Sequence, residues 1–228
     1  MPVEPPPSAW RIRAAAAPGE DLVGVGADLE PATLLQAYRA GLFPMGVGRA
    51  GAGPIGWWSP DPRGVLLPGD LHVSRSLRRA RAHCEIRVNT AFEQVVRQCG
   101  DPAREGAWIT PQIHLAYARL HRLGWAHSVE TWQHGQLVGG LYGIAIGGLF
   151  AGESMYHHAR DASKVALVGL VEQLSAQSCG EPWAVDVQWR TEHLGSLGVR
   201  EVPRTAYLEL VAELVAGPSR WPELPDTV

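Results

Sequence analysis

The chain of 228 residues has room for one domain of ordinary size, or for a main domain with a small N-terminal partner. Apolar residues make up 46% of it and charged residues only 19%, so it can bury a core, and wholesale disorder is excluded. The formal net charge of −3 argues mildly against nucleic acid as a partner, although the distribution of charge matters more than its total.

No membrane or export signal is evident in the sequence. No apolar run reaches the roughly 18 to 20 residues that would span a bilayer. Residues 1–20 are rich in proline and alanine, which is unlike a signal peptide, and we expect them to be poorly ordered. The three cysteines, Cys84, Cys99 and Cys179, have neither CxxC nor metal-ligand spacing. We therefore expect reduced thiols in a cytoplasmic protein.

A glycine-rich segment follows the first predicted helix. Residues 31–40 fit a short helix with proline at its first position. Residues 45–56 are predicted to form a loop. Gly46, Gly48 and Gly51 have the GxGxxG spacing of a dinucleotide site. We reject that site because the sequence predicts no strand before the glycines and no helix after them.

Three further helices are predicted in the next third of the chain. The first covers residues 74–83, with Ser74 as its N-cap. The second runs from residue 89 or 90 to about 98. The third begins at Thr110, with Pro111 at its first position, and ends near residue 124.

After residue 124 the apolar period changes to that of strands. Tight turns at His134-Gly135 and Gly147-Gly148 indicate an antiparallel meander. Its strands are followed by a mostly apolar helix, a further strand and a last helix. These elements cover, in order, residues 127–132, 137–146, 149–155, 161–176, 183–189 and 205–215. The order predicts an α+β fold, compatible with an acetyltransferase-like sheet.

Several local strings are far more specific than any bulk property. They are Ala37-Tyr38-Arg39, Gly41-Leu42-Phe43-Pro44, Trp57-Trp58-Ser59-Pro60-Asp61-Pro62-Arg63, Leu71-His72-Val73-Ser74-Arg75-Ser76, Trp108-Ile109-Thr110, Gly152-Glu153-Ser154-Met155, Ala162-Ser163-Lys164, Asp186-Val187-Gln188 and His193-Leu194-Gly195-Ser196-Leu197-Gly198. In this order and at these separations they resemble the leucyl/phenylalanyl-tRNA–protein transferase family. The resemblance covers roughly residues 23–210.

The resemblance implies an α+β, acetyltransferase-like (GNAT-type) mixed sheet with flanking helices and a small N-terminal domain. We expect a poorly ordered segment at 1–20, the small domain at 21–66 and the catalytic domain at 67–228. The implied activity moves Leu, Phe or Met from the 3′ end of aminoacyl-tRNA to the N-terminal Arg or Lys of acceptor proteins, which creates an N-degron for proteolysis. No metal, coenzyme A or other cofactor and no membrane partner are implied, and a monomer is the default.

Asp186 and Gln188 are the expected catalytic pair. They are two apart on a predicted strand, so they point to one face. Alone, this pattern indicates a solvent-facing polar strand. In the resembling family the pair lies at the reaction centre, where Gln188 holds the attacking amine and Asp186 polarises it. Whether Asp186 acts as a base or as an electrostatic anchor stays open.

The expected substrate site adds a carboxylate and an apolar pocket. Glu153 and Ser154 end a predicted strand, where the acid pairs with the acceptor's basic side chain or binds the terminal adenosine. Positions that match the family's donor pocket also read as ordinary core residues. They are Leu141, Phe150, Met155, Leu167, Leu170 and Val185. Such a pocket separates donors that differ by one methylene by only about 1–3 kcal/mol.

The terminal adenine requires a stacking surface. Trp108 matches best, with Tyr38 and Tyr117 beside it. The chain departs from the family's pattern at Met45, where tryptophan is usual, and at Thr191, where asparagine is usual. These departures predict a differently built adenosine site and a changed polar contact near the reaction centre.

An arginine-rich segment is our candidate for gripping the acceptor stem through phosphates. Taken alone it reads equally well as a solvated helix, and Lys164 as an exposed residue that opens a capped helix instead of a phosphate ligand. The expected tRNA-binding residues are Arg75, Arg78, Arg79, Arg81 and Lys164.

Two rival functions remain. An acetyl-CoA-dependent N-acetyltransferase would share the fold, but the bulky segment 156–160 replaces a glycine-rich pyrophosphate loop. A catalytically inert tRNA-binding module would keep the arginines but would have no need for Asp186 and Gln188 together. The pair His157-His158 is rejected as a metal site, because adjacent histidines point apart and no third ligand is suitably spaced.

Overall fold

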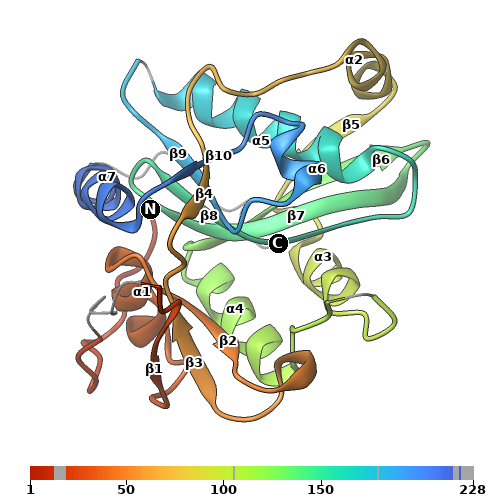
Figure 1. Cartoon of the computed structure of the whole chain (residues 1–228). Helices are drawn as coiled ribbons and strands as arrows, with labels where there is room; N and C mark the ends of the chain where they lie inside the picture. The colour runs from red at the N-terminus through yellow and green to blue at the C-terminus, as the bar shows by residue number, and fades with distance from the viewer. Residues whose placement is uncertain (13–18, 105, 179, 218–220, 222–228) are drawn as a thin grey trace.

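Two β-sheets organise the chain in the computed structural model, which describes residues 1–12, 19–104, 106–178, 180–217 and 221. The smaller sheet has the order β1-β3-β2 and the larger one the order β10-β4-β9-β8-β7-β6-β5 (Figure 1). The strands are β1 (Leu22–Val25), β2 (Phe43–Gly46), β3 (Ile55–Trp58), β4 (Arg63–Leu66), β5 (Glu85–Val88), β6 (Ala126–Gln133), β7 (Gln136–Ile146), β8 (Leu149–His157), β9 (Ala184–Gln188) and β10 (Arg200–Val202).

Helices cover both faces of the larger sheet, with α5 on one face and α3 and α4 on the other (Figure 1). Because each face of β7 and β8 is buried, the two layers form separate apolar clusters. The helices are α1 (Pro31–Arg39), α2 (Arg75–Ala82), α3 (Phe92–Cys99), α4 (Pro111–Arg122), α5 (Ala162–Ser178), α6 (Glu192–Gly195) and α7 (Arg204–Ala216). This arrangement confirms the α+β class and the mixed sheet with flanking helices.

Helix ends that the sequence marked with caps are confirmed. The Ser74 hydroxyl accepts from the Leu77 amide, and the Thr110 hydroxyl accepts from the Ile113 amide. The helix expected from residue 89 or 90 begins later, because Asn89 has a φ of 60° and Ala91 is its N-cap. The side chain of Asn89 instead accepts from the Ser128 amide of β6.

The predicted loop over residues 45–56 is wrong in its two ends. β2 continues to Gly46 and β3 begins at Ile55, so the segment is a hairpin whose tip contains a short 3₁₀ turn, Arg49–Gly51. A Cβ on Gly46 would lie 1.9 Å from the Gly51 carbonyl oxygen, so glycine here permits the chain to fold back on itself. The glycines serve the hairpin, and the sequence signal for strands was masked by them.

Residues 1–12 lie against α1 and against the segment that follows α4. The Val3 amide donates to the Leu123 carbonyl, the Trp125 indole donates to the Val3 carbonyl, and Glu4 forms an ion pair with Arg39. The poor order expected of residues 1–20 stays a prediction, and residues 13–18 lie outside the described residues. The two sheets divide the chain between β3 and β4, because β4 pairs with β9 and β10. The expected domain boundary at residue 66 stays a prediction.

Two β-bulges shape the centre of the larger sheet. β8 and β9 pair in parallel only from Leu149↔Ala184 to Ala151↔Asp186. Beyond that point each strand carries one extra residue relative to the strand on its other side. On β8 the extra residue lies between Gly152 and Ser154, where the pairing with β7 shifts register. On β9 it lies between Asp186 and Gln188, where the pairing with β4 shifts register. Bulges bend a strand and re-aim its side chains. The two strands therefore part where the site described below begins.

No helix among the described residues is long and apolar enough to cross a membrane. Cys84 and Cys99 are free thiols, and Cys179 lies outside the described residues.

Close packing of α5 on β7 predicts a strong response to one added methyl group. A Cβ on Gly139 would lie 2.6 Å from the Cβ of Ala162. We expect Gly139→Ala to lower the free energy of unfolding by about 1–3 kcal/mol, because the start of α5 must move away. Urea denaturation measures this loss. Gly24→Ala is the matched control, since nothing lies within 4 Å of its Cβ; equal effects of the two variants would contradict the packing argument.

Candidate active site

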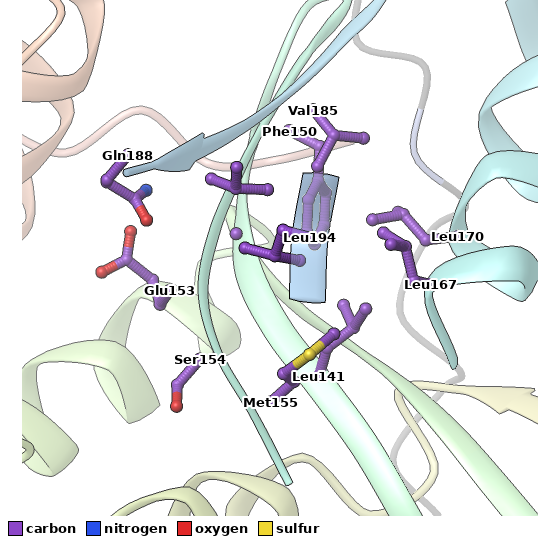
Figure 2. Close-up of a pocket in the computed structure, with 12 residues that line it drawn as sticks. Leu141, Phe150, Glu153, Ser154, Met155, Leu167, Leu170, Val185, Gln188 and Leu194 are labelled. Carbon is purple, nitrogen blue, oxygen red and sulfur yellow. The ribbon is translucent and has the colours of Figure 1, made fainter. Parts of the chain in front are cut away.

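An apolar cavity opens where β8 and β9 part. It is partly open to solvent, has a volume of about 110 Å³ and is lined mainly by side chains of β7, β8, β9 and α5 (Figure 2). The twelve lining residues are Leu141, Phe150, Gly152, Glu153, Ser154, Met155, Leu167, Leu170, Val185, Val187, Gln188 and Leu194. The structure thus brings together all six residues expected for the donor pocket. That they bind a donor side chain stays a prediction.

Glu153 supplies a buried carboxyl group at the polar edge of the cavity. It lies at the bulge of β8 and is 8% exposed. The Tyr38 hydroxyl donates to Oε1 and the Tyr117 hydroxyl donates to Oε2, each at 2.7 Å. Burial raises the pKa of Glu153 to about 7, and the two tyrosine hydrogen bonds oppose this rise. The group therefore changes charge close to neutral pH.

Gln188 faces Glu153 across the gap (Figure 2). Its φ of 60° lies in the left-handed region, which turns the side chain toward the cavity. The side-chain nitrogen Nε2 is buried and has no hydrogen-bond partner among the described residues. An unpaired buried donor is costly unless a ligand satisfies it. The amide is thus available to a polar group at the end of the cavity.

Asp186 does not line the cavity, so the expectation that it shares a face with Gln188 is wrong. The side chain is fully buried on the other side of β9, where Arg63 donates to Oδ1 at 2.8 Å and to Oδ2 at 2.7 Å. The Tyr207 hydroxyl also donates to Oδ2, at 2.8 Å. The simple two-residue alternation fails because the strand bulges and Gln188 adopts a positive φ.

The carboxylate of Asp186 nevertheless supports Gln188 through the backbone. Its Oδ1 accepts from the Gln188 amide at 2.9 Å, which holds the left-handed residue in place. Burial lowers the pKa of Arg63, but the adjacent carboxylate of Asp186 outweighs it and keeps that pKa above its usual value. The guanidinium also donates to the Gly41 carbonyl and lies over the Phe43 ring. The ion pair therefore connects β9 to the small domain.

Of the three residues expected to stack on adenine, two are fully buried and one is partly exposed. Tyr38 and Tyr117 are 2% and 0% exposed, so neither ring has a free face, and that expectation is wrong for both. Their hydroxyls contact each other and Glu153 instead. Trp108 is partly buried beside the tip of the β2–β3 hairpin, and Met45 is partly buried on β2. Adenine stacking on Trp108 stays a prediction.

Thr191, where the family usually has asparagine, makes a defined polar contact. Its side-chain oxygen accepts from the Leu194 amide at 3.2 Å and caps α6. Asparagine and threonine both serve as N-caps, so this contact is not lost. The cap positions Leu194, which lines the cavity and was missed by sequence reasoning, as was Val187. The signal that pointed to Leu194 was its place in the string His193-Leu194-Gly195-Ser196-Leu197-Gly198.

Four of the five cationic residues expected to hold tRNA belong to α2, and the fifth, Lys164, is in the first turn of α5. Arg75, Arg78 and Arg79 are exposed on α2. Arg81 instead forms an ion pair with Glu172 of α5 at 2.8 Å, and Lys164 forms one with Asp161 at 3.2 Å. Among the described residues, no group of three or more His, Cys, Asp or Glu side chains could hold a metal ion.

Comparisons with known proteins match most of the chain to the same family. A family model described as "Leucyl/phenylalanyl-tRNA protein transferase" matches residues 65–212, and one for the N-terminal domain of the same family matches residues 27–61. Leucyl/phenylalanyl-tRNA–protein transferase of Stutzerimonas stutzeri is 49% identical over 205 residues, which is 87% of each protein. The protein of that name from Thiobacillus denitrificans is 50% identical, over 85% of this chain and 84% of the relative.

The solved structures are much less similar. A ribosomal-protein-alanine N-acetyltransferase from Brucella melitensis biovar Abortus 2308 is 18% identical, with a TM-score of 0.32. The match covers 42% of this chain and 75% of that one.

The buried ion pair predicts that substitution of Arg63 lowers the free energy of unfolding much more than substitution of Arg119. We expect Arg63→Met to lower the free energy of unfolding by about 3–5 kcal/mol, because it leaves the Asp186 carboxylate buried without its partner. Arg119→Met is the control, since the Arg119–Glu30 pair is more than half exposed on both sides. Denaturation with urea compares the two variants. A loss of 1 kcal/mol or less for Arg63→Met, on the order of a surface pair, would contradict the role assigned to the pair.

The raised pKa of Glu153 predicts how stability depends on pH. Its contribution is fully present below the unfolded value near 4.5 and is lost as pH rises through about 7. Relative to Glu153→Gln, the wild-type free energy of unfolding should fall by on the order of 3 kcal/mol between pH 4.5 and 8. The exposed Glu209→Gln variant should follow the wild-type profile. Parallel profiles for wild type and Glu153→Gln would refute the raised pKa.

Proposed function

The chain belongs to the leucyl/phenylalanyl-tRNA protein transferase family, and from this premise we propose that it moves leucine, phenylalanine or methionine from aminoacyl-tRNA to the N-terminal arginine or lysine of a protein. The product carries a new apolar N-terminus and serves as an N-degron in the cytoplasm. The observation that carries the proposal is an apolar cavity that ends in an unpaired amide donor and a buried carboxyl group.

The apolar part of the cavity receives the donor side chain. Its lining is almost wholly aliphatic and aromatic, so it selects by size and lipophilicity, which leucine, phenylalanine and methionine share. Three apolar lining residues, Met155, Val187 and Leu194, are only partly buried, and of these the longer Met155 and Leu194 adjust to different shapes. With the side chain in the cavity, the ester carbonyl lies at the polar edge, between Gln188 and Glu153.

Gln188 stabilises the oxygen of the reacting carbonyl. The acceptor's α-amine attacks the carbonyl carbon, and negative charge develops on the oxygen of the tetrahedral intermediate. A buried amide donor without another partner, such as Nε2 of Gln188, stabilises that charge best because it is already oriented. This role differs from holding the amine, since a donor aimed at the amine would compete for the lone pair that attacks.

Glu153 accepts the proton that the amine loses. A general base is most effective when its pKa lies near the working pH, and the pKa of Glu153 is raised to about 7. The C–N bond forms as the ester C–O bond breaks, and the same proton passes to the departing 3′ oxygen of the ribose. Ionised Glu153 retains hydrogen bonds from Tyr38 and Tyr117, which hold its carboxylate still. No covalent enzyme intermediate is needed.

Asp186 acts as a positioning residue. Both of its oxygens are engaged by Arg63, Tyr207 and the Gln188 amide, so neither is available to a substrate. It holds the backbone of Gln188 in its left-handed conformation. Of the two roles that the sequence leaves open for Asp186, these contacts support an electrostatic anchor over a base.

The exposed arginines of α2 are the tRNA contacts that the charge distribution supports best. Arg75, Arg78 and Arg79 present positive charge to solvent, whereas Arg81 and Lys164 already have carboxylate partners. Contacts with phosphates hold the acceptor stem without reading its sequence.

Transfer of radiolabelled leucine or phenylalanine from purified aminoacyl-tRNA to a protein that begins with arginine tests the function. We expect label on that acceptor and none on a version that begins with proline, and no product from acetyl-CoA without tRNA. Gln188→Leu should lower kcat by about 10²–10³-fold, as loss of one oxyanion donor does.

Gln136→Leu, an exposed substitution on β7, is the matched control and should transfer like wild type. Absence of transfer from leucyl-, phenylalanyl- and methionyl-tRNA would overturn the proposed function. Full activity in Gln188→Leu would leave the function intact and remove the role given to Gln188.

A further inference from the structure

Leu194 is the one cavity-lining residue that belongs neither to the sheet nor to α5. It projects from α6 toward the cavity (Figure 2). The opposite walls are made by β7, β8, β9 and α5, whose apolar lining side chains are buried except for those of Met155 and Val187. Leu194 itself is only partly buried and packs against the α5-side core. One wall of the cavity is therefore carried by a separate short element.

The backbone of α6 is held at both ends. Thr191 caps its start by accepting from the Leu194 amide, and the Leu194 carbonyl accepts from the Val199 amide at 3.1 Å. Arg190 lies against Gly195, where a Cβ would be 2.4 Å from its guanidinium, and donates to the Val199 carbonyl. The position of the Leu194 backbone is thus defined, although no residue of α6 is itself buried.

Because the cavity is small, the position of the Leu194 wall decides which side chains fit into it. The cavity holds about 110 Å³. An apolar cavity lined by Leu, Ile and Phe holds benzene at about 150 Å³. A branched or linear aliphatic side chain fits the present space better than a phenyl ring does. A phenyl ring requires one wall to yield, and a partly exposed leucine on α6 yields at less cost than buried residues of close-packed strands.

From these observations we infer that Leu194 sets the upper size of the aminoacyl side chain that the enzyme accepts, so that it determines the preference between aliphatic and aromatic donors. The inference rests on the proposed function, because the occupant of the cavity is taken to be a donor side chain. No catalytic role is assigned to Leu194, since it is an apolar wall and contacts no reacting atom.

The test compares kcat/KM for leucyl- and phenylalanyl-tRNA in wild type and three variants. Leu194→Ala should raise the phenylalanine-to-leucine ratio by about tenfold or more, the scale at which an apolar pocket discriminates by size. Leu194→Phe should shift the ratio the other way and lower transfer of phenylalanine most. Leu115→Ala, at an exposed leucine of α4, is the control and should keep the wild-type ratio. Thermal unfolding of each variant confirms that it is folded.

Equal changes for both donors in Leu194→Ala and Leu194→Phe would overturn the inference. A second readout separates it from the proposed function: binding of non-hydrolysable leucyl- and phenylalanyl-adenosine amides, measured by calorimetry. If wild type transfers no amino acid but the binding ratio shifts with Leu194 as stated, the function fails and the size limit stands. If the binding ratio is the same in all variants, the size limit fails whatever the transfer assay shows.

Discussion

The buried ion pair between Arg63 and Asp186 is the interaction on which the site depends. It joins β4 to β9 inside the larger sheet, and the same guanidinium reaches the Gly41 carbonyl of the small domain. The same carboxylate accepts from the Gln188 backbone, so one pair fixes both the junction of the two sheets and the conformation of the residue at the cavity's polar edge. Its value lies in this specificity, because burying a charge pair contributes little net stability compared with an apolar contact.

The second constraint is the parting of β8 from β9. Two bulges on adjacent strands place Glu153 and Gln188 on opposite sides of the gap between β8 and β9. Apolar side chains line the cavity behind these two residues. Desolvation there raises the pKa of Glu153 to about 7 and leaves the Gln188 amide without a partner. The burial that creates a binding cavity for an apolar side chain thus also prepares the two polar groups for chemistry.

Sequence reasoning captured the features that depend on neighbouring residues. Capped helices such as those at Ser74 and Thr110 and the tight turns of the meander follow from local pattern, whereas the apolar positions of the cavity came from the family resemblance. It missed β1, β4, β5 and β10, because three or four residues carry too little periodicity. The glycines of the β2–β3 hairpin concealed two strands, because the same residues are also typical of loops.

What escaped prediction in the site depends on register and on distant partners. A strand assumed to alternate regularly put Asp186 beside Gln188, but a bulge and a positive φ at Gln188 separate them. Arg63 is far from Asp186 in sequence, and nothing in its local pattern indicates the pairing. The hydroxyls of Tyr38 and Tyr117 likewise meet Glu153 only through the tertiary fold, which removes both rings from the surface.

The most direct test of the account is a crystal structure of the protein with a non-hydrolysable leucyl-adenosine amide. The account predicts the leucyl side chain in the cavity and the carbonyl oxygen within hydrogen-bond distance of Gln188 Nε2. Glu153 should lie beside the amine position, and Asp186 should still be paired with Arg63. A carbonyl bound elsewhere, or an Asp186 carboxylate released from Arg63 to contact the ligand, would contradict it.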